Sequence, residues 1–202
     1  MNGMTIKEYV GDINGGSLML KDSLILAKYL LQDPDTEQWK QFIVEDNVLQ
    51  RKSSQTALRA ASTVKRRLSP LGHDFLKDIL SLTERSYVQL LMAALLVQSP
   101  IMADFMGTVL AEARRIYKPS LEQNSWQNFI DDRRRAWPEL DVYSDETYKK
   151  IGKNVIRSLA EAGYLDSSRN KQIQAVYVEP EVKNWLDKLN RADLIEVMEC
   201  TF

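Results

Sequence analysis

The sequence predicts an all-α, multi-helix globular protein that contains two helix-turn-helix-like elements. Apolar residues recur at spacings of three and four along most of the chain, which is the helical period. Glycine and proline stand mainly at the breaks between these periodic runs, where they end one helix and precede the next. Positive charge is concentrated locally, because residues 47–73 contain six Lys or Arg and no Asp or Glu in a chain of net charge −1. The helices should therefore form the core, and local basic surfaces should carry the function.

The composition is that of an ordinary soluble protein, with 44% hydrophobic and 27% charged residues. The single cysteine, Cys200, excludes an internal disulfide and a cysteine metal cluster, so we expect a reducing, cytoplasmic setting. The N-terminal residues lack the basic stretch and apolar run of a signal peptide. The most apolar segment, 90–97, is much shorter than the roughly 20 residues that span a bilayer. We therefore expect a buried core helix there and no membrane partner.

The first half of the chain should form a series of helices with recognisable boundaries. Ser17 is predicted to cap a helix over 18–31. Asp33-Pro34-Asp35 then ends that helix and starts the next, because proline suits a first helical turn and acids favour the positive helix end. The run 36–49 has a helical apolar period, and a short turn at 50–53 separates it from a second helix over 55–68. This pair has the outline of a helix-turn-helix.

The helix over 55–68 combines a narrow face of small residues with an outer face of long cationic and short hydrogen-bonding side chains. Such side chains bind phosphate oxygens and base edges. A solvated surface helix is the competing interpretation, but such a surface normally intersperses both signs of charge. The predicted buried face consists of Ala57, Ala60, Ala61, Val64 and Leu68. The predicted DNA-binding residues are Arg51, Lys52, Ser53, Ser54, Gln55, Arg59, Ser62 and Arg66, with Thr56, Thr63, Lys65 and Arg67 on the flanks of the helix.

Three further helices are expected over 75–83, 84–98 and 100–117, the last with Ser99 as its cap and Pro100 at its first position. The run Lys118-Pro119-Ser120 is the predicted domain boundary. It divides the chain into an N-terminal helical domain with the basic helix-turn-helix, 1–118, and a C-terminal winged-helix-like domain, 119–202.

The second predicted domain repeats the layout of helix, turn and basic helix. A short helix through Trp126 ends in three adjacent arginines, more than a negative helix end needs. Ser144 caps the next helix, which ends at Gly163. Residues 164–178 alternate as a small β-hairpin would, so the sequence allows a wing, and Pro180 starts a last helical region. The predicted DNA-binding residues of this domain are Arg133, Arg134, Arg135, Lys149, Lys150, Lys153 and Arg157, with Arg169 and Lys171 on the wing.

The sequence contains no recognisable catalytic motif. A Walker loop, a GxGxxG turn, a GxSxG elbow and an HExxH helix are all missing. Adjacent acids such as Asp131-Asp132 point in different directions on a helix, and His73 is the single histidine. We therefore expect no enzyme activity, catalytic residue, metal or cofactor.

Three segments together resemble the BrxA family, the A component of BREX bacteriophage-exclusion systems. They are the helix at 16–31, the run 46–68, and Trp137-Pro138-Glu139-Leu140 followed by 144–166, and the resemblance extends over roughly 15–182. It implies an all-helical fold with helix-turn-helix elements, binding to double-stranded DNA, and service in a defence operon beside a methyltransferase and ATPases. It also implies likeness to NusB, a helical antitermination factor that binds RNA.

These observations predict a non-enzymatic, double-stranded DNA-binding accessory protein of phage defence, held to DNA mainly by phosphate contacts. The alternatives are an adaptor that assembles the defence complex and an RNA-binding protein similar to NusB. Other BREX components are candidate partners, and a monomer is favoured over an obligate oligomer. Charge reversal at Arg59, Arg66 and Arg67 is expected to weaken DNA binding with little effect on stability, because exposed charges contribute little to folding.

Overall fold

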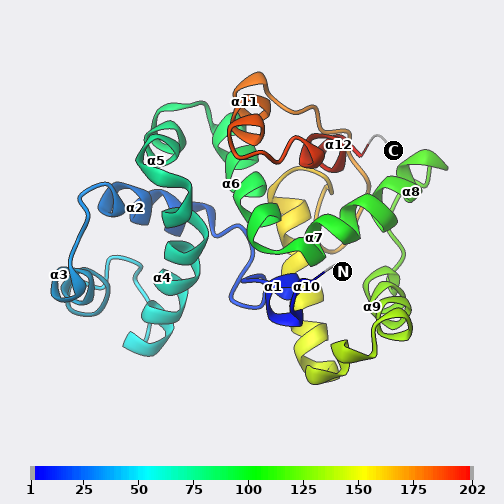
Figure 1. The fold of residues 1–202 in the computed structure, drawn as a ribbon, viewed down its shortest axis with the longest axis horizontal. Helices are drawn as coiled ribbons and strands as arrows, with labels where there is room; N and C mark the ends of the chain where they lie inside the picture. The colour runs from blue at the N-terminus through cyan, green and yellow to red at the C-terminus, as the bar shows by residue number, and fades with distance from the viewer. Residues whose placement is uncertain (1–2, 201–202) are drawn as a thin grey trace.

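The computed structural model describes residues 3–200 and confirms the all-α prediction (Figure 1). Within these residues the only β pairing consists of isolated antiparallel bridges. In chain order, the helices and helical turns are α1 (Ile6–Val10), α2 (Leu20–Leu30), α3 (Thr36–Lys40), the π-helical η1 (Gln41–Glu45), α4 (Ser54–Leu68), η2 (Ser69–Leu71), α5 (Gly72–Ser81), α6 (Glu84–Gln98), α7 (Pro100–Phe105), the π-helical η3 (Met106–Leu110), α8 (Ala111–Arg115), α9 (Ser125–Ala136), η4 (Pro138–Val142), α10 (Asp145–Glu161), α11 (Pro180–Lys188) and α12 (Asp193–Glu199).

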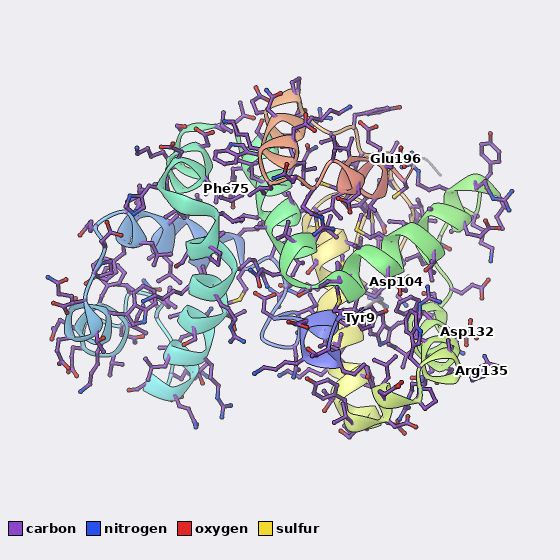
Figure 2. The ribbon with its side chains drawn as sticks, viewed as in Figure 1. Tyr9, Phe75, Asp104, Asp132, Arg135 and Glu196 are labelled. Carbon is purple, nitrogen blue, oxygen red and sulfur yellow. The ribbon has the colours of Figure 1, made fainter. Side chains whose placement is uncertain are left out.

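Helices α2 to α5 lie in the left part of Figure 1, and α1 and α7 to α10 lie in the right part. Helix α6 packs against α4 and α5 and also against α11 and α12. Between α5 and α11, Phe75 meets Trp185 edge to face at a ring-centroid distance of 5.0 Å (Figure 2). One connected cluster of buried side chains includes residues from before and after Lys118. The domain boundary at this position stays a prediction.

Helix α4 has the small-residue face that the sequence predicted. Ala57, Ala61 and Val64 are almost completely buried, and the helix packs against α2. Small side chains on this face let the two helices approach closely. The Ser53 hydroxyl accepts a hydrogen bond of 3.3 Å from the Thr56 amide and caps the start of the helix.

A buried ion pair fixes the other end of α4. The Arg67 Nε and Nη2 atoms donate to the two carboxylate oxygens of Asp12 at 3.1 and 3.2 Å, and both side chains are essentially inaccessible to solvent. Arg67 Nη1 also donates to the Ser17 carbonyl at 2.8 Å. The Ser99 hydroxyl donates to Asp12 at 3.1 Å, and it accepts from the Asp12 and Ile13 amides. These bonds join α4, the segment before α2 and the junction between α6 and α7.

Ser17 and Ser99 were predicted to be helix caps. Ser99 does occupy the N-cap position of α7 with Pro100 next to it, whereas Ser17 does not cap α2, and the hydroxyls of both serines bond to distant groups. The N-cap position of α2 is Met19, and Ser17 Oγ donates to Glu161 of α10 at 3.0 Å. Ser99 Oγ makes no capping bond to α7, because it is bonded to the Asp12 segment. Local sequence shows that these serines can cap a helix, but it cannot show a distant group that competes for the same hydroxyl.

The turn before α4 is longer than predicted. Helix α3 continues into η1 and ends at Glu45, so the expected helix over 36–49 stops four residues early. Residues 46–53 form the connection, in which Asn47 and Gln50 adopt positive φ angles of 45° and 51°. The Asn47 side chain bonds both the amide and the carbonyl of Arg51, at 2.9 and 3.0 Å, and holds this loop in shape.

The predicted hairpin is reduced to minimal pairing. Leu165 pairs with Ile173 through one antiparallel bridge, and Gln172 pairs with Ser120 on the other side. Residues 119–121, 171–173 and 164–166 therefore lie side by side, in that order, without forming a regular strand. The loop from Asp166 to Lys171 connects two of the three segments.

The buried ion pair predicts a sharp contrast between two adjacent arginines. Substituting Arg67→Met leaves the Asp12 carboxylate buried without its partner, which costs on the order of 3–5 kcal/mol of unfolding free energy. The matched substitution Arg66→Met removes an exposed side chain, and we expect a change within about 0.5 kcal/mol. Urea denaturation followed by circular dichroism measures both, and equal stabilities would contradict a structural role for Arg67.

Candidate nucleic-acid interface

The exposed surface of α4 and of the residues just before it is basic and contains no acid. Lys52, Arg59 and Arg66 are exposed, and none of them forms an ion pair with any residue between 3 and 200. Gln55 and Ser62 lie on the same outer surface, together with Ser54 and Thr56. The surface thus offers three cations that are available to a polyanion.

Besides Ser53 and Thr56, which bond each other at the start of α4, four residues of the predicted first site have internal partners, which corrects the expected extent of the basic surface. Arg67 is buried in its ion pair with Asp12. Thr63 is also buried, and its hydroxyl donates to the Arg59 carbonyl at 2.9 Å. Arg51 forms an ion pair with Asp22. Lys65 Nζ lies 4.5 Å from the centre of the Trp39 ring in a cation–π contact.

Arg133 is bonded to a carboxylate inside the protein and is not part of an open cationic patch. Its Nε and Nη2 atoms donate to the Asp104 carboxylate at 2.6 and 2.5 Å, and the Tyr9 hydroxyl donates to the same carboxylate at 2.6 Å (Figure 2). The bonds to Asp104 raise the pKa of Arg133. Burial, aided by the negative charge of Asp104, raises the pKa of Tyr9. This cluster joins α1, α7 and α9.

The next two arginines are also paired with acids. Arg134 donates to Asp141 at 2.6 Å and to Asp145 at 2.7 Å, which raises its pKa and fixes α9 to the start of α10. Arg135 forms an ion pair with Asp132 one turn earlier, and Figure 2 shows both side chains on the outer side of α9. The triple-arginine run is therefore neutralised locally, contrary to the open patch that the sequence suggested.

The cationic ridge on α10 does lie on the surface. Lys149, Lys150, Lys153 and Arg157 are all exposed, and among residues 3–200 Lys150 and Lys153 have no acidic partner. Lys149 pairs with Glu146 at 2.7 Å, which raises the pKa of the lysine, and Arg157 pairs with Glu161 at 2.8 Å. The Lys149–Glu146 pair is exposed and lies within one helix, where such pairs contribute only about 0.2–0.5 kcal/mol, so a phosphate can replace this acid. Glu161 also accepts hydrogen bonds from Ser17 and the Leu18 amide, so it remains in place beside Arg157.

This ridge borders a hollow of about 520 Å³ that lies between α9, α10 and the loop after α10. Gln123 and Gln127 line one side of the hollow, and Ser168 of the loop lines another. Lysine, arginine and amide side chains thus converge on a single open depression. Its chemistry suits a phosphate backbone.

The two predicted wing residues have different environments. Arg169 is exposed on the loop, which Asp166 holds by accepting hydrogen bonds from Ser167, Asn170 and Gln172. Lys171 is buried, and its ammonium group donates to Gln123 Oε1 at 2.9 Å. Burial lowers the pKa of Lys171. Only Arg169 remains available at the wing tip.

Gly152 sets the distance between α9 and α10. A Cβ atom at this position would lie 2.2 Å from Trp126 Cδ1, far inside van der Waals contact. The indole cannot move away easily, because it is buried and its Nε1 donates to the Tyr148 carbonyl at 2.8 Å. The hollow beside α10 therefore depends on a glycine that the sequence analysis did not single out.

An exposed apolar feature on α8 and α9 also escaped the sequence analysis. Ile116 is 46% exposed and Tyr117, with φ of 56°, is 92% exposed. Ile116 lines a groove of about 330 Å³ with an apolar floor that includes Leu121 and Phe129. The only signal available in the sequence was an apolar pair directly after two arginines at the end of a helix.

No group of three or more His, Cys, Asp or Glu in residues 3–200 is placed to hold a metal ion. In the same residues no single helix has both the length and the apolar character needed to cross a membrane. Helix α6 taken together with the helical run Pro100–Arg115 meets these criteria, but the two are bent by 107°.

Comparison with known proteins identifies similar chains over nearly the whole length. The family model of BrxA matches residues 7–190. BREX protein BrxA of Escherichia coli O9:H4 (strain HS) is 41% identical over 193 residues, which cover 96% of this chain and 91% of that protein. BREX protein BrxA of Paramagnetospirillum magneticum (strain ATCC 700264 / AMB-1) is 31% identical over 196 residues, or 97% and 98% of the two chains. The crystal structure of an uncharacterized protein from Magnetospirillum magneticum superposes with a TM-score of 0.85 at 29% identity, covering 96% of this chain and all of that one.

The substitution Gly152→Ala tests the close contact between α9 and α10, because this contact decides whether the added methyl group stabilises or destabilises the protein. In an ordinary helix interior, alanine stabilises relative to glycine by about 0.5–1 kcal/mol. Here the added methyl group meets Trp126, so we expect destabilisation by about 1–3 kcal/mol. Thermal unfolding measures the change, and Gly152→Ala should cost less in a Trp126→Leu background, where the added methyl group meets a smaller side chain. A stabilising Gly152→Ala would contradict the close crossing of α9 and α10.

Proposed function

The chain belongs to the BrxA family of BREX phage-defence proteins, and on this premise we propose that it is a non-enzymatic accessory protein that binds double-stranded DNA. Binding is mainly electrostatic and uses two surfaces. One is the outer face of α4 and the other is the ridge and hollow beside α10. The proposal that the chain is not an enzyme rests on the missing catalytic motifs.

The observation that carries the proposal is the set of unpaired cations on α4. Most other arginines in this protein have a carboxylate partner, as Arg133 and Arg134 illustrate. Lys52, Arg59 and Arg66 have none among residues 3–200, although the chain contains 28 acids. Cations that remain unpaired on a rigid helix suit a ligand that supplies negative charge from outside.

The order of elements around α10 supports DNA as that ligand. The segment at Ser120 precedes α9 and α10, and the segments at Leu165 and Gln172 follow them and pair with Ile173 and Ser120. A bridged segment, two helices and two further bridged segments in this order resemble the element order of a winged helix, although no regular strand forms among residues 3–200. In this proposal the ridge of α10 contacts the phosphate backbone, and Arg169 lies on the loop that takes the place of the wing.

A protein-interaction adaptor is the second candidate, because a specific feature favours it. Ile116, which is 46% exposed, lines a groove with an apolar floor, and its chain neighbour Tyr117 is 92% exposed, so this end of α8 offers apolar surface to a partner. Its partner would be another BREX component. RNA binding, as in NusB, remains the third candidate, and competition between duplex DNA and structured RNA distinguishes it from the first.

The salt dependence of duplex binding tests the leading proposal. If about six phosphates are neutralised, log K should fall against log salt with a slope of about −5. Reversing Lys52, Arg59 and Arg66 to Glu removes about three of these contacts, so the slope should become about −2.5 to −3. Fluorescence anisotropy with a labelled duplex gives both slopes, and a response independent of salt would sink the proposal.

A control with the same change in net charge separates the local surface from the overall charge. Lys77, Arg115 and Lys188 are exposed residues of α5, α8 and α11, and their reversal to Glu should leave the slope near its original value. If the two triple variants lose binding equally, the effect belongs to net charge and not to α4.

Tyr117→Ala tests the adaptor candidate. Because the side chain is exposed, its removal should leave both the unfolding midpoint and duplex affinity unchanged. Co-purification with a BREX component from cells that express the whole system should fall severalfold. Unchanged recovery of every component would argue against this surface as a protein interface.

A further inference from the structure

The exposed face of α4 has features that phosphate binding alone does not require. We propose that α4 reads base edges in the major groove, an inference that rests on the proposed DNA binding. Gln55 and Arg59 are the specificity-determining residues, and Leu58 makes an apolar contact. In this arrangement the α10 surface contributes phosphate contacts that are independent of sequence.

Side chains on this face have unused hydrogen-bonding capacity. Gln55, Arg59 and Ser62 make no side-chain hydrogen bond to any residue between 3 and 200. Some exposed polar residues elsewhere bond to neighbours on the same helix, for example Gln127 to Asp131 and Arg135 to Asp132. A guanidinium and a primary amide can each present two groups to one base, which is the geometry of direct readout.

Leu58 lies within this polar strip. It is 38% exposed, whereas Ala57, Ala61 and Val64 form the buried side of this part of α4. Positions 55, 58, 59 and 62 are spaced by three and four, so their side chains line one strip of the helix. An apolar side chain between donors matches the major-groove edge of a sequence that contains thymine, whose methyl group is apolar.

The start of α4 is suited to approach an anion. Its first turn contains no acid, whereas the first turns of α6 and α10 contain Glu84 and Asp145. Acids normally favour that position because they offset the positive helix end. Lys52 adds a cation just before the helix, so the residues that enter the groove first carry positive charge.

Helix α4 is held in place at both ends. Arg67 anchors the end of α4 in the core, and Ser53 caps its start. The strip therefore meets DNA in one orientation, which direct readout needs. Residues 55, 58 and 59 lie within little more than one helical turn, about 5.4 Å of rise, so they reach two or three adjacent base pairs. Arg59 suits guanine O6 and N7, and Gln55 suits adenine N6 and N7.

Duplexes are first selected from a random library with the purified full chain. The affinity of the chain for an enriched duplex is then compared with its affinity for a scrambled duplex at about 150 mM salt. The wild-type chain should bind the enriched duplex at least about tenfold more tightly, the range of one bidentate base contact. Arg59→Lys keeps the charge but loses the planar fork. It should reduce this ratio about tenfold and change affinity for the scrambled duplex less than about twofold.

Two further variants sharpen the result. Arg115→Lys, a charge-preserving change on α8 and away from α4, should leave the affinity ratio unchanged, and Leu58→Ala should reduce it on a duplex that contains thymine. Thermal midpoints confirm that these exposed substitutions leave the fold intact.

The negative outcomes are distinguishable. Equal affinity of the wild-type chain for enriched and scrambled duplexes, or an equal loss on both with Arg59→Lys, would overturn base readout while leaving electrostatic DNA binding in place. No binding to any duplex at about 50 mM salt would overturn the proposed function together with this inference.

Discussion

The ion pair between Arg67 and Asp12 is the constraint on which the rest of the molecule depends. Both charges are removed from water, so each is tolerable only in the presence of the other. Their bonds extend to the Ser17 carbonyl and the Ser99 hydroxyl, which lie on the segment before α2 and at the bend between α6 and α7. One arginine thereby fixes the orientation of α4 relative to the remaining helices. Because α4 is fixed, the side chains on its opposite face have a fixed direction toward solvent.

The cations of this protein fall into two structural classes. Arg67 and Arg133 connect elements that are distant in sequence, and Arg134 and Arg135 bond acids near them in the chain. Cations such as Arg59 and Lys153 have no acidic partner in residues 3–200. A cation already bonded to a buried carboxylate cannot exchange it for a phosphate without leaving that carboxylate desolvated and unpaired. An arginine is therefore structural when the fold gives it a buried carboxylate partner, and it is a candidate ligand of DNA when the fold leaves it exposed without one.

The sequence predicted the helices well because apolar spacing, capping serines and proline breaks are local signals. Helix α4 and its alanine face follow directly from residues 53–68. The buried arginine could not be predicted in this way, since Arg66 and Arg67 are identical in type and adjacent in the chain. The helical phase of Arg67 falls on the border of the apolar face, and its partner Asp12 is 55 positions away. Likewise, the partner of Arg133 is Asp104 on another helix, and no local pattern identifies Gly152 as the contact of Trp126.

Acidic net charge is compatible with DNA binding when charge is segregated. The C-terminal helices are rich in acids, and Figure 2 shows Glu196 on α12 in the upper right part of the view, away from α4 at the left. Over distances longer than the Debye length of about 8 Å, salt screens these acids from a phosphate that contacts α4. At closer range the phosphate meets the local field of Lys52, Arg59 and Arg66. Exposed acids also lie close to α4, because η1 packs against this helix and ends in Glu45, with Asp46 next in the chain. The attraction of a duplex to this region therefore comes from the outer face of α4 itself, where no acid lies.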